Sequence, residues 1–374
     1  MNNRKKKMVF LFPHSPNPRM LKRIDALKDN FEIEVIYWNR GISSEKDNKI
    51  PSGINHKVIT NKESKNKLNS VLFTRLKVAL IAIKEIRNMH PDYIYISKTD
   101  MLLVGQLYKK VFKKDVELIY EVSDLHSLMI DDTKSFKLKF FQKTLYFFER
   151  NFCRNIKLLV VTSEYFYDYY YKKFIEEEKV LFIPNTPKEE VFKQIKKVKN
   201  KYLTIGFIGV IRYAKQIEML IDAAQEVEIK VLIAGNGDDY LRIKRYVKNK
   251  KNVEIYGSYN YDEEIKMLYE KIDIVYSVYD LNMKNVQYAL PNRLYEGIFT
   301  QTPIIAAKET YLGEIVNDYN IGEIIIYDNI QELTEVIKKY KTGNNLNMQK
   351  ENMLLLKDKW QLDRFNEKLN QLLL

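Results

Sequence analysis

The chain has 374 residues, of which 45% are hydrophobic and 30% charged, with a formal net charge of +13. This composition excludes a disordered or fibrous protein, and the length suffices for two domains with separate cores. A single cysteine, Cys153, excludes an internal disulfide, and four scattered histidines offer little for a structural zinc site. We therefore expect a protein that binds no metal and resides in the reducing cytoplasm.

The positive charge is concentrated in the first half of the chain. Residues 1–200 contain 39 Lys and Arg against 24 Asp and Glu, a balance of +15, whereas residues 201–374 contain 23 against 25, a balance of −2. Compositional drift in a lysine-rich chain explains part of this asymmetry. We favour a basic face that docks on an anionic membrane surface, because no recognisable nucleic-acid module accompanies the charge.

The basic start of the chain resembles a signal peptide only at its first residues. The apolar run that follows stops at Pro13, and no window is uncharged over the roughly 18 residues needed to cross a bilayer. We therefore expect a cytoplasmic protein that is at most peripheral on the inner face of the cell membrane.

Short β-branched runs alternate with helix-length segments in the first half, which predicts βαβ units and a parallel sheet. The expected strands are 8–12, 33–38, 56–60, 93–97, 118–122, 158–162 and 180–183, and the expected helices include 19–28, 71–89 and 134–152. The pattern then restarts with strands at 203–210, 230–234, 253–256, 272–278, 303–306 and 323–326.

These elements predict an α/β fold of two doubly wound, Rossmann-like domains that face a cleft. The first domain spans residues 1–187, a charged linker covers 188–201, and the second domain spans 202–350. Residues 351–374 carry an apolar stripe at helical spacing, and we expect them to form a helix that packs back on the first domain. The carboxyl ends of both sheets would then surround a ligand.

Residues 288–297, YALPNRLYEG, form the most informative stretch of the second half. They predict a loop and a helix started by Pro291, whose exposed amides attract anions such as a phosphate, with Glu296 in the first turns. Earlier, Gly209 ends a buried strand and is followed by Arg212 and Lys215, two cations that can flank a diphosphate. Residues 235–238, GNGD, also follow a strand, and a plain capped turn explains them equally well.

These motifs resemble the nucleotide-sugar loops of GT-B glycosyltransferases, especially family 4 and related capsular and O-antigen polysaccharide glycosyltransferases. The resemblance implies a GT-B fold in which Glu296 binds the ribose, while Arg212 and Lys215 neutralise the diphosphate during catalysis. It further implies donor-nucleotide contacts at Gly209, Asn292, Arg293 and Leu294.

The chain departs from the family pattern at two places. The family's first acidic position, eight residues before Glu296, is occupied by Tyr288, which with Pro291 would face the donor sugar. The family's arginine directly after the strand is replaced by Val210, for which Arg212 and Lys215 are the expected substitutes. The first departure leaves the sugar and the retaining stereochemistry open.

Two loops of the first half carry further candidates. Asp124 and His126 leave a strand end and are suited to proton handling or to gripping a sugar hydroxyl, although a capped turn explains them equally well. His14 and Arg19 follow the first strand, where the resemblance implies the acceptor side. The lysine- and phenylalanine-rich segment 134–148 suits a helix lying on a membrane, or a helix with core aromatics and solvated lysines. The exposure of Phe136, Phe140 and Phe147 distinguishes these two interpretations.

The sequence therefore predicts a metal-independent hexosyltransferase that needs no cofactor. It would move a sugar from a nucleoside diphosphate sugar, UDP-linked in the first instance, to a glycan or polyprenyl-linked acceptor in bacterial surface polysaccharide assembly, with retention. The alternatives are a non-catalytic nucleotide- or glycan-binding partner and a nucleotide-sugar epimerase on the same fold.

Overall fold

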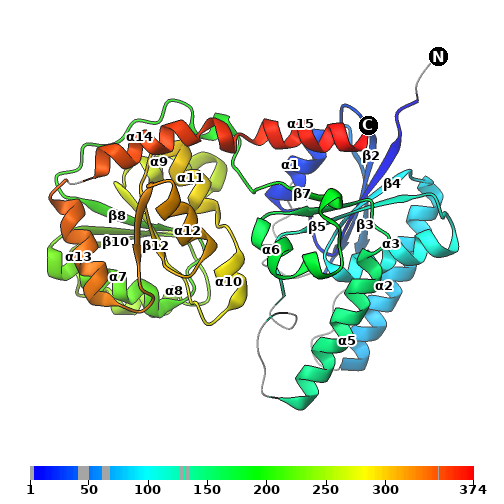
Figure 1. The fold of residues 1–374 in the computed structure, drawn as a ribbon, viewed down its shortest axis with the longest axis horizontal. Helices are drawn as coiled ribbons and strands as arrows, with labels where there is room; N and C mark the ends of the chain where they lie inside the picture. The colour runs from blue at the N-terminus through cyan, green and yellow to red at the C-terminus, as the bar shows by residue number, and fades with distance from the viewer. Residues whose placement is uncertain (1–3, 41–49, 61–67, 127–129, 131–134, 344) are drawn as a thin grey trace. The chain divides into compact units, whose positions relative to one another are not determined.

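The computed structural model describes residues 4–40, 50–60, 68–126, 130, 135–343 and 345–374. The chain forms two compact units, Met1–Ile183 with Asp363–Leu374, and Pro184–Leu362 (Figure 1). No helix in the described ranges is long and apolar enough to span a membrane.

The first unit is built on a seven-stranded parallel sheet in the order β3-β2-β1-β4-β5-β6-β7. Its strands are β1 (Lys7–Phe12), β2 (Glu32–Asn39), β3 (Asn55–Thr60), β4 (Tyr93–Ser97), β5 (Glu117–Val122), β6 (Leu158–Val161) and β7 (Val180–Phe182). Its helices are α1 (Pro18–Leu27), α2 (Leu68–Met89), α3 (Thr99–Val111), α5 (Phe136–Cys153), α6 (Glu164–Tyr169) and the terminal α15 (Leu362–Leu373), with the short 3-10 helices η1 (Tyr171–Lys173) and η2 (Glu177–Lys179).

Local sequence explains why these elements form. Strand β4 is buried along its whole length and β1 along all but its first residue, as expected for parallel strands covered by helices on both faces. Helix α1 begins at Pro18, and the Asn17 side chain caps it by accepting a hydrogen bond from the Met20 amide at 3.1 Å.

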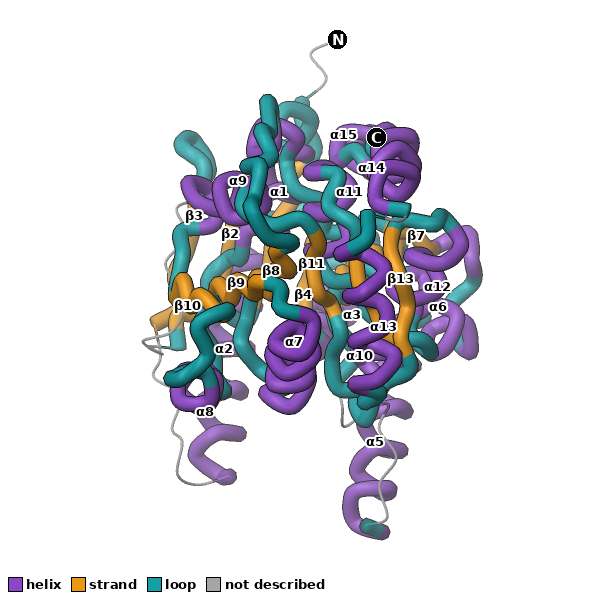
Figure 2. The backbone as a smooth tube through the Cα atoms, turned by 90° about the vertical axis from the view of Figure 1, so that its left-hand side faces the viewer, coloured by secondary structure: helices purple, strands orange, loops and turns teal. Residues whose placement is uncertain are grey.

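The second unit repeats the plan with a six-stranded parallel sheet in the order β10-β9-β8-β11-β12-β13, most of which Figure 2 shows side by side. Its strands are β8 (Thr204–Ile208), β9 (Lys230–Ala234), β10 (Val253–Gly257), β11 (Ile274–Ser277), β12 (Ile304–Ala307) and β13 (Gly322–Ile325). Its helices are α7 (Ala214–Val227), α8 (Tyr240–Tyr246), α9 (Tyr261–Glu270), α10 (Lys284–Tyr288), α11 (Asn292–Thr300), α12 (Tyr311–Asp318), α13 (Ile330–Lys341) and α14 (Leu346–Leu356), with the 3-10 helices η3 (Glu189–Phe192) and η4 (Asp358–Trp360). The predicted α/β class, with two doubly wound sheets, is confirmed.

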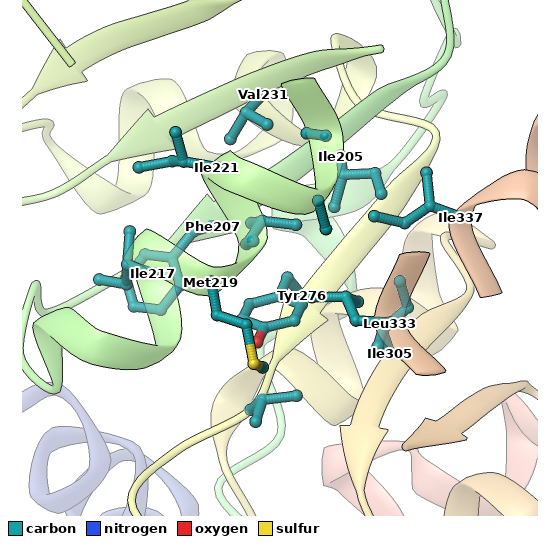
Figure 3. Packing of buried hydrophobic residues seen from close by; sticks show 14 of the residues in the cluster. Ile205, Phe207, Ile217, Met219, Ile221, Val231, Tyr276, Ile305, Leu333 and Ile337 are labelled. Atoms are coloured by element: carbon teal, nitrogen blue, oxygen red, sulfur yellow. The ribbon is translucent and has the colours of Figure 1, made fainter. Parts of the chain in front are cut away.

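The core of the second unit lies between its sheet and helices α7 and α13 (Figure 3). Phe207 from β8 and Tyr276 from β11 meet Ile217 of α7 and Leu333 of α13, and all four side chains are at most 1% exposed. This packing fixes the carboxyl ends of β8 and β11, from which the site loops leave.

Two predicted boundaries differ from the structure. The predicted linker 188–201 packs along the second unit, where the Val198 amide donates to the Glu270 carbonyl at 2.9 Å and Phe192 is buried. The predicted single helix 351–374 is two helices, α14 in the second unit and α15 in the first. Helix α15 is held in the first unit by a hydrogen bond from the side-chain amide of Asn370 to the backbone carbonyl of Ala26, at 2.9 Å. Residue 134 of the predicted helix 134–152 lies outside the described residues.

Candidate active site

The sheet of the second unit has a topological switch point between β8 and β11. From β8 the chain continues to β9 on one side, whereas the neighbour on the other side is β11. Doubly wound sheets bind ligands outside the carboxyl ends of the strands at this position. The predicted donor residues Gly209, Arg212 and Arg293 all lie at or next to this edge.

Glycines allow the loops after β8 and β9 to pack backbone against backbone. The Gly209 amide donates to the Ala234 carbonyl and the Ile211 amide to the Asn236 carbonyl, both at 2.9 Å. A Cβ atom on Gly235, whose φ is +136°, would lie 1.8 Å from the Gly209 carbonyl oxygen. These contacts give the predicted GNGD turn a structural role in holding the Gly209 loop.

Arg293 is buried directly beneath this loop. Its Nε donates to the Ile208 carbonyl and its Nη1 to the Tyr276 carbonyl, at 3.3 Å, so the guanidinium joins the ends of β8 and β11. It stacks 3.9 Å over the Phe207 ring, and its Nη2 lies 2.9 Å from where a Cβ atom of Gly209 would stand. No carboxylate of the described residues forms an ion pair with Arg293, so its charge remains to attract an anion at the switch point.

Glu296 lies one helical turn after Arg293 and is 3% exposed. Its two carboxylate oxygens accept hydrogen bonds from the Tyr261 and Tyr269 hydroxyls, each at 2.9 Å. Burial, followed by the charge of Glu296, raises the pKa of both tyrosines, so both remain neutral donors. The two tyrosines, which the sequence reasoning did not select, therefore orient a carboxylate that accepts up to about four hydrogen bonds.

The two predicted cations after β8 differ in their surroundings. The Arg212 side chain is exposed and stacks on Tyr213 at 5.1 Å, and no ion pair involves it within the described ranges. Lys215, also exposed, forms an ion pair with Asp328. Arg212 is therefore the more available partner for a phosphate.

The remaining predicted residues of the second unit lie around the start of α11. Pro291 is the N-cap residue of α11. Tyr288 is the last residue of α10 and is half-buried. Asn292 is exposed, and its side-chain oxygen accepts a hydrogen bond from the side-chain amide of Asn185 at 2.8 Å. The Leu294 side chain is fully buried, and the predicted contact between this residue and the nucleotide stays a prediction.

In the first unit, Asp124 and His126 are both exposed, and the Ser123 hydroxyl donates to Asp124 at 3.1 Å. His14 is half-buried, with its Nδ1 2.8 Å from the Ser15 carbonyl. The Arg19 Nε lies 2.8 Å from the buried carboxylate of Glu121, and the acceptor-side role of His14 and Arg19 stays a prediction.

Glu121 is the centre of a buried polar cluster that the sequence reasoning missed. Arg23 approaches its second oxygen at 3.4 Å, and the Tyr95 hydroxyl donates to the same oxygen. Burial alone would raise the pKa of Glu121, but Arg23 and Arg19 outweigh it and hold the pKa below its usual value. An acidic residue inside the apolar run 118–122 was the available signal.

The comparisons with known proteins concern the fold and one family model. Residues 187–354 match the model of a family described as glycosyl transferases group 1. Over 98% of its length the chain superposes on 99% of the Anabaena protein HepE, determined in complex with UDP, with a TM-score of 0.72 at 15% identity. The chain has the GT-B fold.

Two further known proteins are similar to the chain. Sucrose-phosphate synthase from Thermosynechococcus elongatus superposes with a TM-score of 0.71 at 14% identity, covering 98% of each chain. The succinoglycan biosynthesis protein ExoL from Rhizobium meliloti is 23% identical over 261 residues, which are 66% of this chain and 63% of ExoL. The match to this curated relative thus leaves more than a third of ExoL uncovered.

Proposed function

We propose that the chain is a glycosyltransferase that moves a sugar from a UDP-sugar to a glycan or lipid-linked acceptor in surface polysaccharide assembly, with retention at the anomeric carbon. The observation that carries the proposal is the pairing of buried Arg293 with Glu296 at the switch point of the second sheet. A cation beneath a glycine loop suits a diphosphate, and an oriented carboxylate one helical turn away suits ribose hydroxyls.

The cations would stabilise the leaving group. As the bond to the sugar breaks, negative charge develops on the UDP oxygen, and fixed positive charge lowers the energy of that transition state. Arg212 would contact the diphosphate directly, whereas Arg293 would act from beneath Gly209. We infer that these cations serve in place of a metal ion, so the reaction needs no cofactor.

The donor and acceptor classes rest on the comparisons. HepE was determined with UDP and with UDP-glucose, which supports a UDP-sugar donor. ExoL is named for succinoglycan biosynthesis, which supports a polysaccharide acceptor. Asp124 and His126 remain predicted sugar contacts, and their exposure is what such contacts require.

The experiment is transfer of radiolabelled sugar from UDP-glucose, UDP-galactose and GDP-mannose to polyprenyl-diphosphate-linked acceptors, with and without EDTA. We expect label in the lipid fraction from a UDP-sugar in both conditions, and NMR of the product should show the anomeric configuration of the donor. Conversion of the donor without an acceptor would instead identify an epimerase. Transfer only from GDP-mannose, or only without EDTA, would contradict the donor or the metal-free mechanism.

A further inference from the structure

Helix α5 in the first unit leaves most of its apolar side chains outside the core. Of its 18 residues, Glu149 and Cys153 are the buried ones. Phe136, Phe140 and Phe147 are 84%, 68% and 62% exposed. At about 100° per residue, their spacing of four and seven places these rings within roughly 40° of one another, so they form a single stripe.

The neighbouring helices repeat this arrangement. Helix α2 exposes Phe73, Leu76 and Leu80 to 70%, 59% and 61%, at a spacing of three and four residues that also gives one stripe. Helix α3 packs against both α2 and α5, and it exposes large apolar residues along its own length, including Val111 at 65%. Figure 1 shows α2 and α5 projecting in the same direction from the first sheet.

Positive charge surrounds these stripes. Helices α2, α3 and α5 together contain ten Lys and Arg against three acidic residues, one of which is the buried Glu149. On α5, Lys139, Lys143 and Arg150 flank the phenylalanine stripe. The whole first unit holds 36 Lys and Arg against 24 Asp and Glu, a balance of +12, whereas the second unit holds 26 against 25, a balance of +1.

The C-terminal part of α5 is anchored to the first unit by hydrogen bonds to Glu149. Glu149 accepts hydrogen bonds from the hydroxyls of Tyr170 at 2.7 Å, Tyr171 at 2.9 Å, Tyr120 at 3.2 Å and Thr99 at 3.4 Å. These donors come from β5, α3 and the segment after α6, so the helix is fixed to three parts of the unit. The C-terminal part of α5 is therefore anchored to the unit, and Phe136 and Phe140 lie on the turns that precede it.

We propose that α2, α3 and α5 form the surface by which the first unit docks on a bilayer that contains anionic lipids, with the α5 phenylalanines entering the headgroup region. Aromatic rings flanked by cations suit this boundary, where the rings leave water and the cations meet lipid phosphates. A second copy of the chain suits the surface poorly, because a two-fold contact would bring like charges together. This inference goes beyond the proposed sugar transfer, and its test does not require activity.

The test is co-sedimentation of the full chain with vesicles of phosphatidylcholine mixed with phosphatidylglycerol, and with vesicles of phosphatidylcholine alone. Wild type should bind the mixed vesicles, and high salt should weaken that binding. The variant Phe136→Ser/Phe140→Ser/Phe147→Ser and the variant Lys137→Glu/Lys139→Glu/Lys143→Glu should each bind at least about tenfold more weakly. The matched control, Leu241→Ser/Lys244→Glu on exposed positions of α8 in the second unit, should bind like wild type.

Quenching of tryptophan fluorescence by brominated lipid tests whether α5 enters the bilayer. Trp38 and Trp360 are 1% and 3% exposed, so a tryptophan introduced by Phe140→Trp is the one that brominated lipid should quench. Absence of quenching, or unchanged binding of the triple serine variant, would overturn the proposal. Light scattering that shows a wild-type dimer converted to a monomer by the serine substitutions would identify a second copy as the occupant instead.

Discussion

Arg293 and Arg212 show how position decides what a cation can do. Arg293 donates two hydrogen bonds to carbonyls at the ends of β8 and β11. Its guanidinium lies beneath Gly209, at the carboxyl edge of the sheet. Arg212 extends into solvent at the same edge. We propose that Arg293 organises the loop and contributes positive electrostatic potential, whereas Arg212 binds a phosphate directly.

The two cations after β8 should therefore contribute unequally. We expect Arg212→Ala to weaken UDP binding roughly tenfold, because a charge-assisted bond to phosphate is lost. Lys215→Ala should cost less than about threefold, since its ammonium already pairs with Asp328 at an exposed position. Equilibrium dialysis with labelled UDP measures both, and equal losses would contradict this ranking.

Glu296 is best tested with Gln, because Ala would leave a cavity and two buried tyrosine hydroxyls without an acceptor. Glu296→Gln should weaken UDP binding by roughly 1.5 to 3 kcal/mol, the range for hydrogen bonds to a charged group. The difference between wild type and variant should disappear with 2′,3′-dideoxy-UDP, which lacks both ribose hydroxyls. A difference that persists with the dideoxy nucleotide would remove Glu296 from the ribose site.

Glu149 predicts a pH dependence of the stability of the first unit. Burial raises its pKa despite four hydroxyl donors, so between the ordinary glutamate pKa and the raised value the folded state binds more protons than the unfolded state. The free energy of unfolding should then fall as pH rises through this window.

Denaturation with urea, in a Trp360→Phe background so that Trp38 reports the first unit, measures this effect. Glu149→Gln cannot ionise, so its stability relative to wild type should increase with pH across the same window. A difference that stays constant with pH would show that Glu149 titrates normally.

At the scale of elements, the strands were the most predictable feature. Every expected strand is present. The central parallel strands are buried on both faces and read as short β-branched runs, whereas the edge strands β3 and β10 are more exposed. The terminal helix was mispredicted because the apolar stripe continues through the break at η4, where Trp360 is buried against Tyr295. The segment 188–201 looked like a linker because its lysines dominate its composition, although Lys197 donates to the Tyr269 and Ile272 carbonyls in the second unit.

The site was less predictable than the fold. Arg293 and Glu296 follow from one local motif, residues 288–297, and Gly209 follows from a second local motif at the end of a strand. Tyr261 and Tyr269 belong to another helix and meet Glu296 only through tertiary packing. In a chain with 27 tyrosines, spacing alone does not single out these two.

The close contact between the loops after β8 and β9 predicts that Gly235→Ala strongly destabilises the second unit. Both Gly235→Ala and Gly343→Ala place a side chain at positive φ, which costs about 1 kcal/mol. Only at Gly235 does the new Cβ collide with backbone, so this variant should lose at least about 2 kcal/mol more. In a Trp38→Phe background, Trp360 fluorescence reports the second unit, and equal destabilisation of the two variants would contradict the close approach of the loops.

For the whole molecule, the charge asymmetry follows the boundary between the two structural units. The second unit carries the nucleotide motifs and is nearly neutral, whereas the first unit carries the charge and the exposed aromatic helices. This separation supports our two proposals, in which the second unit binds the donor and the first unit docks on the membrane. Variants of α5 should therefore leave UDP affinity unchanged, and variants of the Gly209 loop should leave vesicle binding unchanged.

The most direct test of the donor assignment is calorimetric titration of the whole protein with UDP, GDP, CDP and ADP, alongside Glu296→Gln and Arg212→Ala. We predict that UDP binds at least about tenfold more tightly than the other three nucleotides, as the proposed UDP-sugar donor requires. Both substitutions should weaken UDP binding, because the proposed site contacts ribose and diphosphate together. Equal binding of all four nucleotides, or binding of UDP that neither substitution changes, would contradict the assignment of the site.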